Sequence, residues 1–134
     1  MSRRERVLSD DSGSSPVEFV LVGALLTALT LAVLQLGFAV YVRNVVHDAA
    51  VEGAHYAALA DTTLAEGAER TEQVITRAVG TDFAEDVAVG ESARLGHPTV
   101  VVRVRATLPV IGMIGVPYAM EVEAHAPVET LGDG

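Results

Sequence analysis

The chain has 134 residues, a formal net charge of −9 and no cysteine. The lack of cysteine excludes a disulfide framework, a thiolate metal site and a cysteine nucleophile. All nine basic residues are arginines and they are scattered along the chain. Because phosphate binding requires clustered cations, we expect no nucleic-acid partner.

The first predicted element is a membrane-spanning helix over residues 19–42, a run without a formal charge. At ~1.5 Å per residue this run gives about 36 Å of helix, enough to cross a hydrocarbon core of ~30 Å. A buried helix of a soluble protein is the alternative, but such helices seldom run so far without polar interruption. A cleaved secretory signal has an apolar region of only ~7–15 residues that ends in a small-x-small site, which this run lacks.

The arginines around this run predict its orientation. Arg3, Arg4 and Arg6 precede it and Arg43 follows it. An excess of arginine marks the cytoplasmic side of a membrane helix. We therefore expect a single-pass protein of the cell membrane, with a cytoplasmic N-terminus and an extracytoplasmic C-terminal domain.

Small residues recur on one face of the predicted span, at helical spacing, together with one glutamine. Small side chains let helices approach closely in lipid, and a glutamine among them can hydrogen-bond across the contact. Ordinary alanine richness is the alternative explanation. The predicted helix-packing face consists of Ala24, Ala28, Ala32, Gln35 and Ala39.

After the span, the absence of helix breakers predicts that the helix continues to about residue 60. Gly53 lies inside this extension and indicates either close packing or drift, because glycine costs ~1 kcal/mol relative to alanine within a helix. A second helix is predicted over residues 63–79. Thr63 and Glu66 have the spacing of a capping box at its start, and Gly80 closes it.

Beyond residue 80 the apolar period changes to two, which predicts strands over residues 87–89, 100–108 and 118–126, with residues 90–98 as a connecting loop. Arg103 and Arg105 could face Glu121 and Glu123 across neighbouring strands. The predicted fold is α+β: a long N-terminal transmembrane helix that continues into an exported domain with a second helix and a small three-stranded antiparallel sheet. We divide the chain into a leader (1–13), the transmembrane helix with its extension (14–60) and an extracytoplasmic domain (61–134).

The loop between the last two predicted strands has an apolar tip over residues 110–116. An exposed apolar loop either folds into the core of its own domain or contacts a partner or the bilayer surface. Docking into the domain's own core is the interpretation we favour.

The sequence contains no nucleophile elbow, phosphate loop or dinucleotide turn. His47, Asp48, Glu52 and His55 cluster on the helix extension, but their spacing matches no established ligand motif and a solvated helix face explains them as well. We therefore expect no catalytic residue, metal site, cofactor or small-molecule substrate.

The junction before the span carries the strongest functional signal. It reads Gly13-Ser14-Ser15-Pro16-Val17-Glu18-Phe19, so a lone carboxylate stands at the edge of the apolar run. A carboxylate at a bilayer edge costs free energy unless an interaction compensates it. Glu18 therefore requires a partner.

A charged leader, a glycine, four residues, a glutamate and an apolar helix resemble the class III signal of type IV pilin-like proteins. Together with residues 36–38, 41–44 and 49–57, the junction resembles the TadE-like family of tight-adherence (Flp) pilus assembly proteins. That family is pseudopilin-like, with one N-terminal membrane helix and an exported α+β domain. It usually has arginine where this chain has Val51 and His55.

The resemblance implies that a prepilin peptidase cuts after Gly13 and leaves Ser14 as the new N-terminus. It also implies that Glu18, beside Phe19, is an assembly contact that neutralises the N-terminal ammonium of a neighbouring subunit. The expected function is a pseudopilin-like structural component of a tight-adherence pilus or related secretion system, with the membrane, the peptidase and other pilin-like or Tad-system membrane proteins as partners. The alternative is an unprocessed signal-anchored envelope protein whose outer domain binds another partner.

Overall fold

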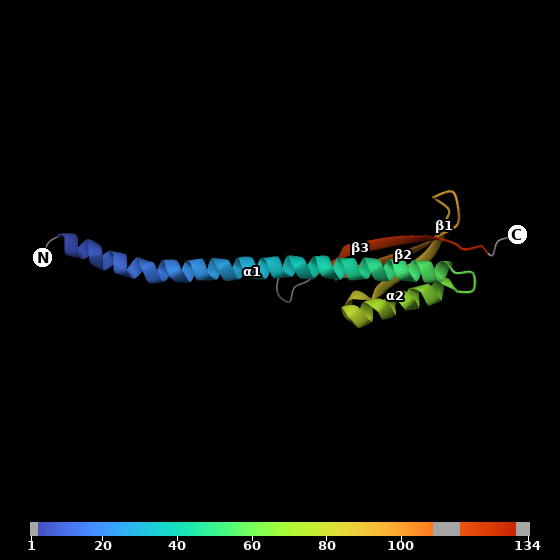
Figure 1. Cartoon of the computed structure of the whole chain (residues 1–134), viewed down its shortest axis with the longest axis horizontal. Helices are drawn as coiled ribbons and strands as arrows, with labels where there is room; N and C mark the ends of the chain where they lie inside the picture. Colours follow the sequence, from blue (N-terminus) through green and yellow to red (C-terminus); the bar gives the residue numbers. More distant parts are fainter. Residues whose placement is uncertain (1–2, 109–115, 131–134) are drawn as a thin grey trace. The chain divides into compact units, whose positions relative to one another are not determined.

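The computed structural model describes residues 3–108 and 116–130. The chain separates into two units, Met1–Leu36 and Gly37–Gly134. The elements follow the order α1, α2, η1, β1, β2 and β3 (Figure 1). Two helices and an antiparallel sheet confirm the predicted α+β fold.

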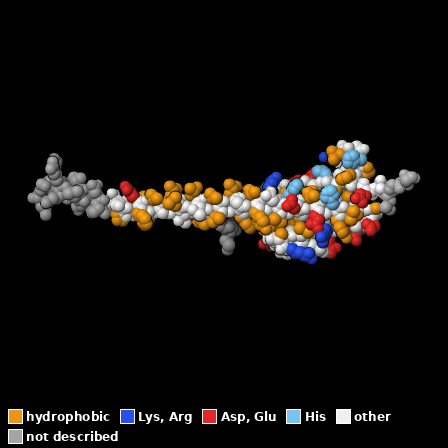
Figure 2. All heavy atoms as spheres, viewed as in Figure 1, with side chains coloured by type: hydrophobic (Ala, Val, Ile, Leu, Met, Phe, Trp, Pro, Cys, Tyr) orange, Lys and Arg blue, Asp and Glu red, His pale blue; other side chains and the backbone are white. Residues whose placement is uncertain are grey.

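Helix α1 spans Arg3–Ala58, and its part up to Leu36 makes up the first unit. From Ser14 onward nearly all side chains of this unit are exposed, and Figure 2 shows hydrophobic side chains along its described length. The hydroxyls of Thr27 and Thr30 each donate a 2.8 Å hydrogen bond to the carbonyl four residues earlier. Their polar groups are thus satisfied within the helix, as a hydrocarbon environment requires.

The second unit begins with the rest of α1, which confirms that the helix continues past the predicted span. From Val42 onward one face of α1 is buried, and it joins one face of the sheet in a single core. The largest fully buried side chains include Ile75 of α2 and Met120 of β3. The other buried hydrophobic residues are Val42, Val46, Ala49, Ala50, Ala54, Ala57, Ala58, Ala84, Val100, Val102, Val104, Ala106, Val122, Ala124 and Ala126.

The sheet contains β1 (Asp86–Ser92), β2 (Thr99–Leu108) and β3 (Val116–Pro127), antiparallel in the order β1-β2-β3. The predicted strands are confirmed, but β1 is longer than expected. Its last residues, 90–92, were predicted as loop and instead pair with residues 99–101 of β2. Glycine is depleted in strands, and the backbone pairing to β2 overrides that preference here.

Helix α2 spans Leu64–Ala78 and has the predicted capping box. The Thr63 N–H donates to Glu66 Oε2 at 2.6 Å, and the Glu66 N–H donates to Thr63 Oγ1 at 3.2 Å. Val79 is the C-cap, and Gly80 follows it at a φ of 109°. A short 3₁₀ turn, η1 (Thr81–Phe83), then leads into β1 and was not predicted.

Two glycines explain how closely α1 and α2 approach each other. A Cβ added to Gly53 of α1 would lie 2.8 Å from the Gly67 carbonyl oxygen and would collide with the Thr71 hydroxyl. A Cβ added to Gly67 of α2 would lie 2.9 Å from the Gly53 carbonyl oxygen and would collide with Ala57. Gly53 therefore marks close packing, and not drift.

The outer face of the sheet carries the predicted cross-strand charge pairs. Arg103 lies opposite Glu123, and Arg105 lies opposite Glu121. Arg103 contacts Glu123 at 2.7 Å and Glu121 at 3.2 Å, and Arg105 contacts Glu121 at 3.2 Å. The hydrogen bond from Arg103 lowers the pKa of Glu123 below its ordinary value of 4.5.

Replacing Gly53 or Gly67 by alanine should destabilise the second unit by about 1–3 kcal/mol, the usual range for overpacking a tight contact. Backbone carbonyls stand in the way in both cases, so the two helices must move apart. Thermal unfolding of the full chain in detergent, followed by circular dichroism, measures the effect. Gly37→Ala is the matched control in α1, because a Cβ there meets nothing within 4 Å; an equal transition temperature for all variants would contradict the close crossing.

The lowered pKa of Glu123 predicts a pH dependence. The Glu123 carboxylate binds a proton more weakly in the folded protein than in the unfolded chain. The Arg103–Glu123 pair therefore contributes fully to the free energy of unfolding above the ordinary carboxyl pKa, and this contribution is lost as the pH falls through the lowered pKa. Carboxyl ¹³C NMR should show Glu123 titrating at lower pH in the folded protein than in the unfolded chain. Arg103→Gln should move the Glu123 midpoint upward; an unchanged midpoint would exclude Arg103 as the cause.

Candidate functional site

The junction predicted from the sequence lies inside α1. The helix runs without a break through the Gly13–Ser14 bond and through Glu18 and Phe19. Phe19 is 80% exposed and Glu18 is also exposed. In the described part of the chain, the Glu18 carboxylate makes no hydrogen bond or ion pair. The structure therefore presents Glu18 as an available anion next to an exposed apolar surface.

The predicted helix-packing face lies on one side of α1. Ala24, Ala28 and Ala32 are exposed, whereas Gln35 and Ala39 are half-buried. A contact of this face with a second helix stays a prediction.

The predicted helix-packing face continues along the same side of α1. Residues 18 positions apart lie on one face of an α-helix, because 18 residues make about five turns. The five positions of the predicted face are followed, 18 residues later, by residues that are all buried in the core of the second unit: Val42, Val46, Ala50, Gly53 and Ala57.

The histidine and carboxylate residues of the helix extension do not converge on one point. Glu52 contacts Arg70 of α2 through both Nε and Nη2, with 2.8 Å between Arg70 Nε and Glu52 Oε1. His47 Nδ1 lies 3.9 Å from Asp48 Oδ1, and both side chains are exposed. Among the residues that the structure describes, no group of three or more potential ligands could hold a metal ion. Glu52 therefore joins the two helices.

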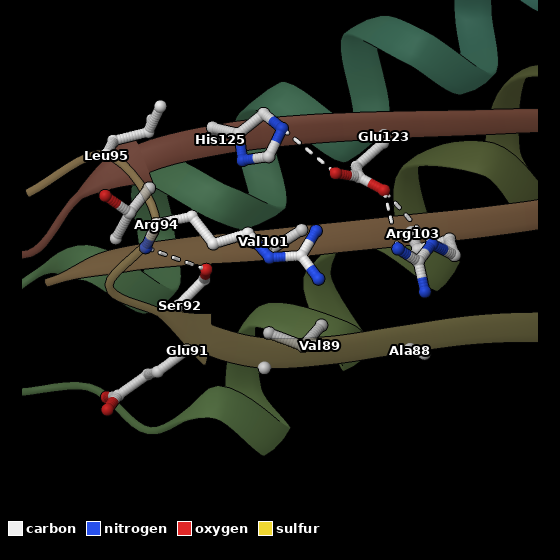
Figure 3. Close-up of a pocket in the computed structure, with 12 residues that line it drawn as sticks. Ala88, Val89, Glu91, Ser92, Arg94, Leu95, Val101, Arg103, Glu123 and His125 are labelled. Carbon is white, nitrogen blue, oxygen red and sulfur yellow. Dashed lines mark hydrogen bonds and ion pairs between the residues drawn. The ribbon is translucent and has the colours of Figure 1, made fainter.

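The outer face of the sheet has a hollow of about 660 Å³ that sequence reasoning missed. The loop at residues 93–98 connects β1 to β2, and Arg94 and Leu95 from this loop line the hollow together with Val101 of β2 (Figure 3). Sequence patterns do not encode how such a loop folds, and the only available signal was His125 on an exposed strand face.

Several of the polar groups in this hollow contact one another. The Glu123 carboxylate contacts Arg103 on one side and His125 Nε2, at 3.1 Å, on the other (Figure 3). Among the described residues that line it, Ser92 and Thr99 carry hydroxyls. Ser92 Oγ accepts a hydrogen bond from the Arg94 backbone N–H, and Thr99 Oγ1 lies against His97. The charged side chains of β2 and β3 thus form a ladder of ion pairs on the outer face of the sheet.

The apolar tip predicted at residues 110–116 lies outside the described residues, except for Val116 at the start of β3. Its docking stays a prediction.

In the described part of the chain, one helix is long and apolar enough to cross a membrane: α1, from Ser14 onward. This helix lies near the N-terminus and fits a single-pass membrane protein.

Comparison with known proteins agrees with the resemblance noted in the sequence. No curated protein and no solved structure matches the chain significantly. The family described as TadE-like protein matches residues 13–55, which cover the junction, the apolar span and the helix extension up to the glycine crossing. Over these residues the chain is similar to TadE-like proteins.

Proposed function

We propose that this protein is a pseudopilin-like structural component of a tight-adherence pilus or a related secretion system. The observation that supports this most directly is the placement of Glu18 five residues after Gly13, at the start of a membrane-length helix whose side chains are exposed. A helix of this kind needs lipid or other helices around it. The protein is built into an assembly and carries out no catalysis of its own.

In this proposal a prepilin peptidase cuts the Gly13–Ser14 bond on the cytoplasmic side of the membrane. The apolar helix then stays attached to the mature chain and serves as both anchor and assembly surface. The three arginines of the leader support a cytoplasmic N-terminus, and the second unit is then extracytoplasmic.

Cleavage would also create the partner that Glu18 lacks. The new ammonium group at Ser14 of one subunit can pair with the Glu18 carboxylate of its neighbour. Two opposite charges at a bilayer edge compensate each other, whereas either alone is costly. The face with Ala24, Ala28, Ala32, Gln35 and Ala39 would bring neighbouring helices close enough for this contact.

A second candidate is an unprocessed signal-anchored envelope protein whose outer domain binds another partner. The hollow on the sheet's outer face, with the exposed Leu95 at its rim, favours it. The two candidates differ in whether Gly13 is needed for cleavage and Glu18 for assembly.

Processing predicts a mature chain that begins at Ser14. Intact-mass measurement and N-terminal sequencing of the membrane-purified protein, from cells with an active prepilin peptidase, should show the loss of residues 1–13. Gly13→Leu should block this loss, because a bulky side chain then stands next to the cut bond, while Gly23→Leu, at an open position within the span, should not. A wild-type chain that still begins before Gly13 would contradict the proposal.

Assembly predicts that Glu18→Gln, which removes the charge and keeps the size, reduces co-purification with other pilin-like or Tad-system membrane proteins at least tenfold. Membrane insertion should be unchanged. The matched control is Glu85→Gln, which removes an exposed carboxylate of the second unit. If Glu18→Gln and Glu85→Gln co-purify with these partners like the wild type, the anchored-protein alternative is the better description.

A further inference from the structure

We propose that α1 has a second possible start at Ser15, and that the chain is cut while its helix begins there. This inference rests on the proposed processing and adds Ser15 and Pro16 to the residues that control it. In the structure α1 begins at Arg3 and contains the Gly13–Ser14 bond. A bond within a helix is protected from proteolysis in proportion to how rarely the helix opens.

Pro16 weakens the helix immediately before it. Proline has no N–H, so the Ser12 carbonyl cannot accept its helical hydrogen bond, and the proline ring crowds that same carbonyl. The residue before a proline, here Ser15, is also disfavoured in helical conformation. Gly13 adds a poor helix former at the cleavage position. Figure 1 shows the first turns of α1 inclined to the turns that follow, and proline is a common cause of such bends.

The residues from Ser15 onward favour a new helix start. Ser15-Pro16-Val17-Glu18 has the form of a capping box, with serine at the N-cap, proline at the first helical position and glutamate at the third. The chain already contains one formed box of this type, in which Thr63 and Glu66 exchange two hydrogen bonds at the start of α2.

In the continuous helix this second box is not formed, because the Ser15 N–H is directed to an earlier carbonyl. The exposed Glu18 carboxylate is therefore available. Opening the turns before Pro16 would release the Ser15 N–H to Glu18 and let the Ser15 hydroxyl accept from the Glu18 N–H. The hydrogen bonds lost upstream are thus partly replaced, and the Gly13–Ser14 bond lies outside the helix.

This gives Glu18 two separable roles: capping before cleavage and charge pairing after it. Glutamine can take the glutamate position in a capping box, but it carries no charge. Glu18→Gln should therefore be cleaved like the wild type although its assembly fails. Glu18→Ala should lose both functions.

The test uses the full chain in detergent micelles, with ¹³Cα chemical shifts as a measure of helix at residues 10–15. Pro16→Ala, Ser15→Ala and Glu18→Ala should shift these residues toward helical values and slow cleavage in peptidase-containing membranes about fivefold or more, the factor expected from the loss of one cap. Glu18→Gln and Val17→Ala, which leave the box intact, should match the wild type in both measurements.

Wild-type residues 10–15 as helical as residues 20–25, or unchanged shifts in Pro16→Ala and Glu18→Ala, would overturn the second start point. The chemical shifts need no peptidase, so the two proposals fail separately. A wild type with the expected shifts that is never cleaved would overturn the processing, and with it the role of the second start in cleavage, but not the second start itself. Normal cleavage of all variants with unchanged shifts would overturn this inference alone.

Discussion

The backbone hydrogen bonding of α1 is the constraint on which the rest of the structure depends. A chain segment in hydrocarbon must satisfy its own N–H and carbonyl groups, and a continuous helix does so at every residue. From residue 19 to the end of the first unit the helix carries no charged side chain, and the hydroxyls of Thr27 and Thr30 donate hydrogen bonds to its backbone carbonyls. From Val42 the same helix must also bury one face in a protein core, and its side chains change accordingly.

The helices contribute mostly small side chains to that core. The buried face of α1 consists mostly of alanine, valine and glycine, so α2 and the sheet approach its backbone closely. This close approach is clearest where Gly53 of α1 crosses Gly67 of α2. The Glu52–Arg70 ion pair lies beside this crossing at the surface. Small residues therefore determine the geometry, while Ile75 and Met120 supply the larger apolar contacts.

Periodicity and capping chemistry were sufficient to predict most of the fold. The span and its extension, the Thr63–Glu66 box and the alternation in β2 and β3 each depend on residues close in sequence. The end of β1 was missed because Gly90 and Ser92 resemble a turn, and only pairing with β2 makes them strand. Gly53 was ambiguous for the same reason, because the close packing that explains it is with Gly67, on another helix.

The candidate site divides in the same way. The spacing of Gly13 and Glu18 is local, so the sequence and the family resemblance located it. Whether the cleavage bond lies in a helix depends on the competition between Pro16 and the turns around it, which a motif does not reveal. The hollow beside His125 depends on how residues 93–98 fold, and no residue pattern predicts that.

Among the carboxylates, Glu18 differs from those that serve the fold. Glu52, Glu121 and Glu123 each contact an arginine within the chain, and their charges are compensated as soon as the second unit folds. Glu18 stands beside Phe19, the most exposed aromatic side chain of the apolar helix, and contacts no arginine among the side chains that the structure describes. In the proposed assembly, the Glu18 carboxylate gains its contact when a neighbouring subunit supplies the cation. In the proposed function, association would compensate this charge, and the helix would serve assembly as well as anchoring.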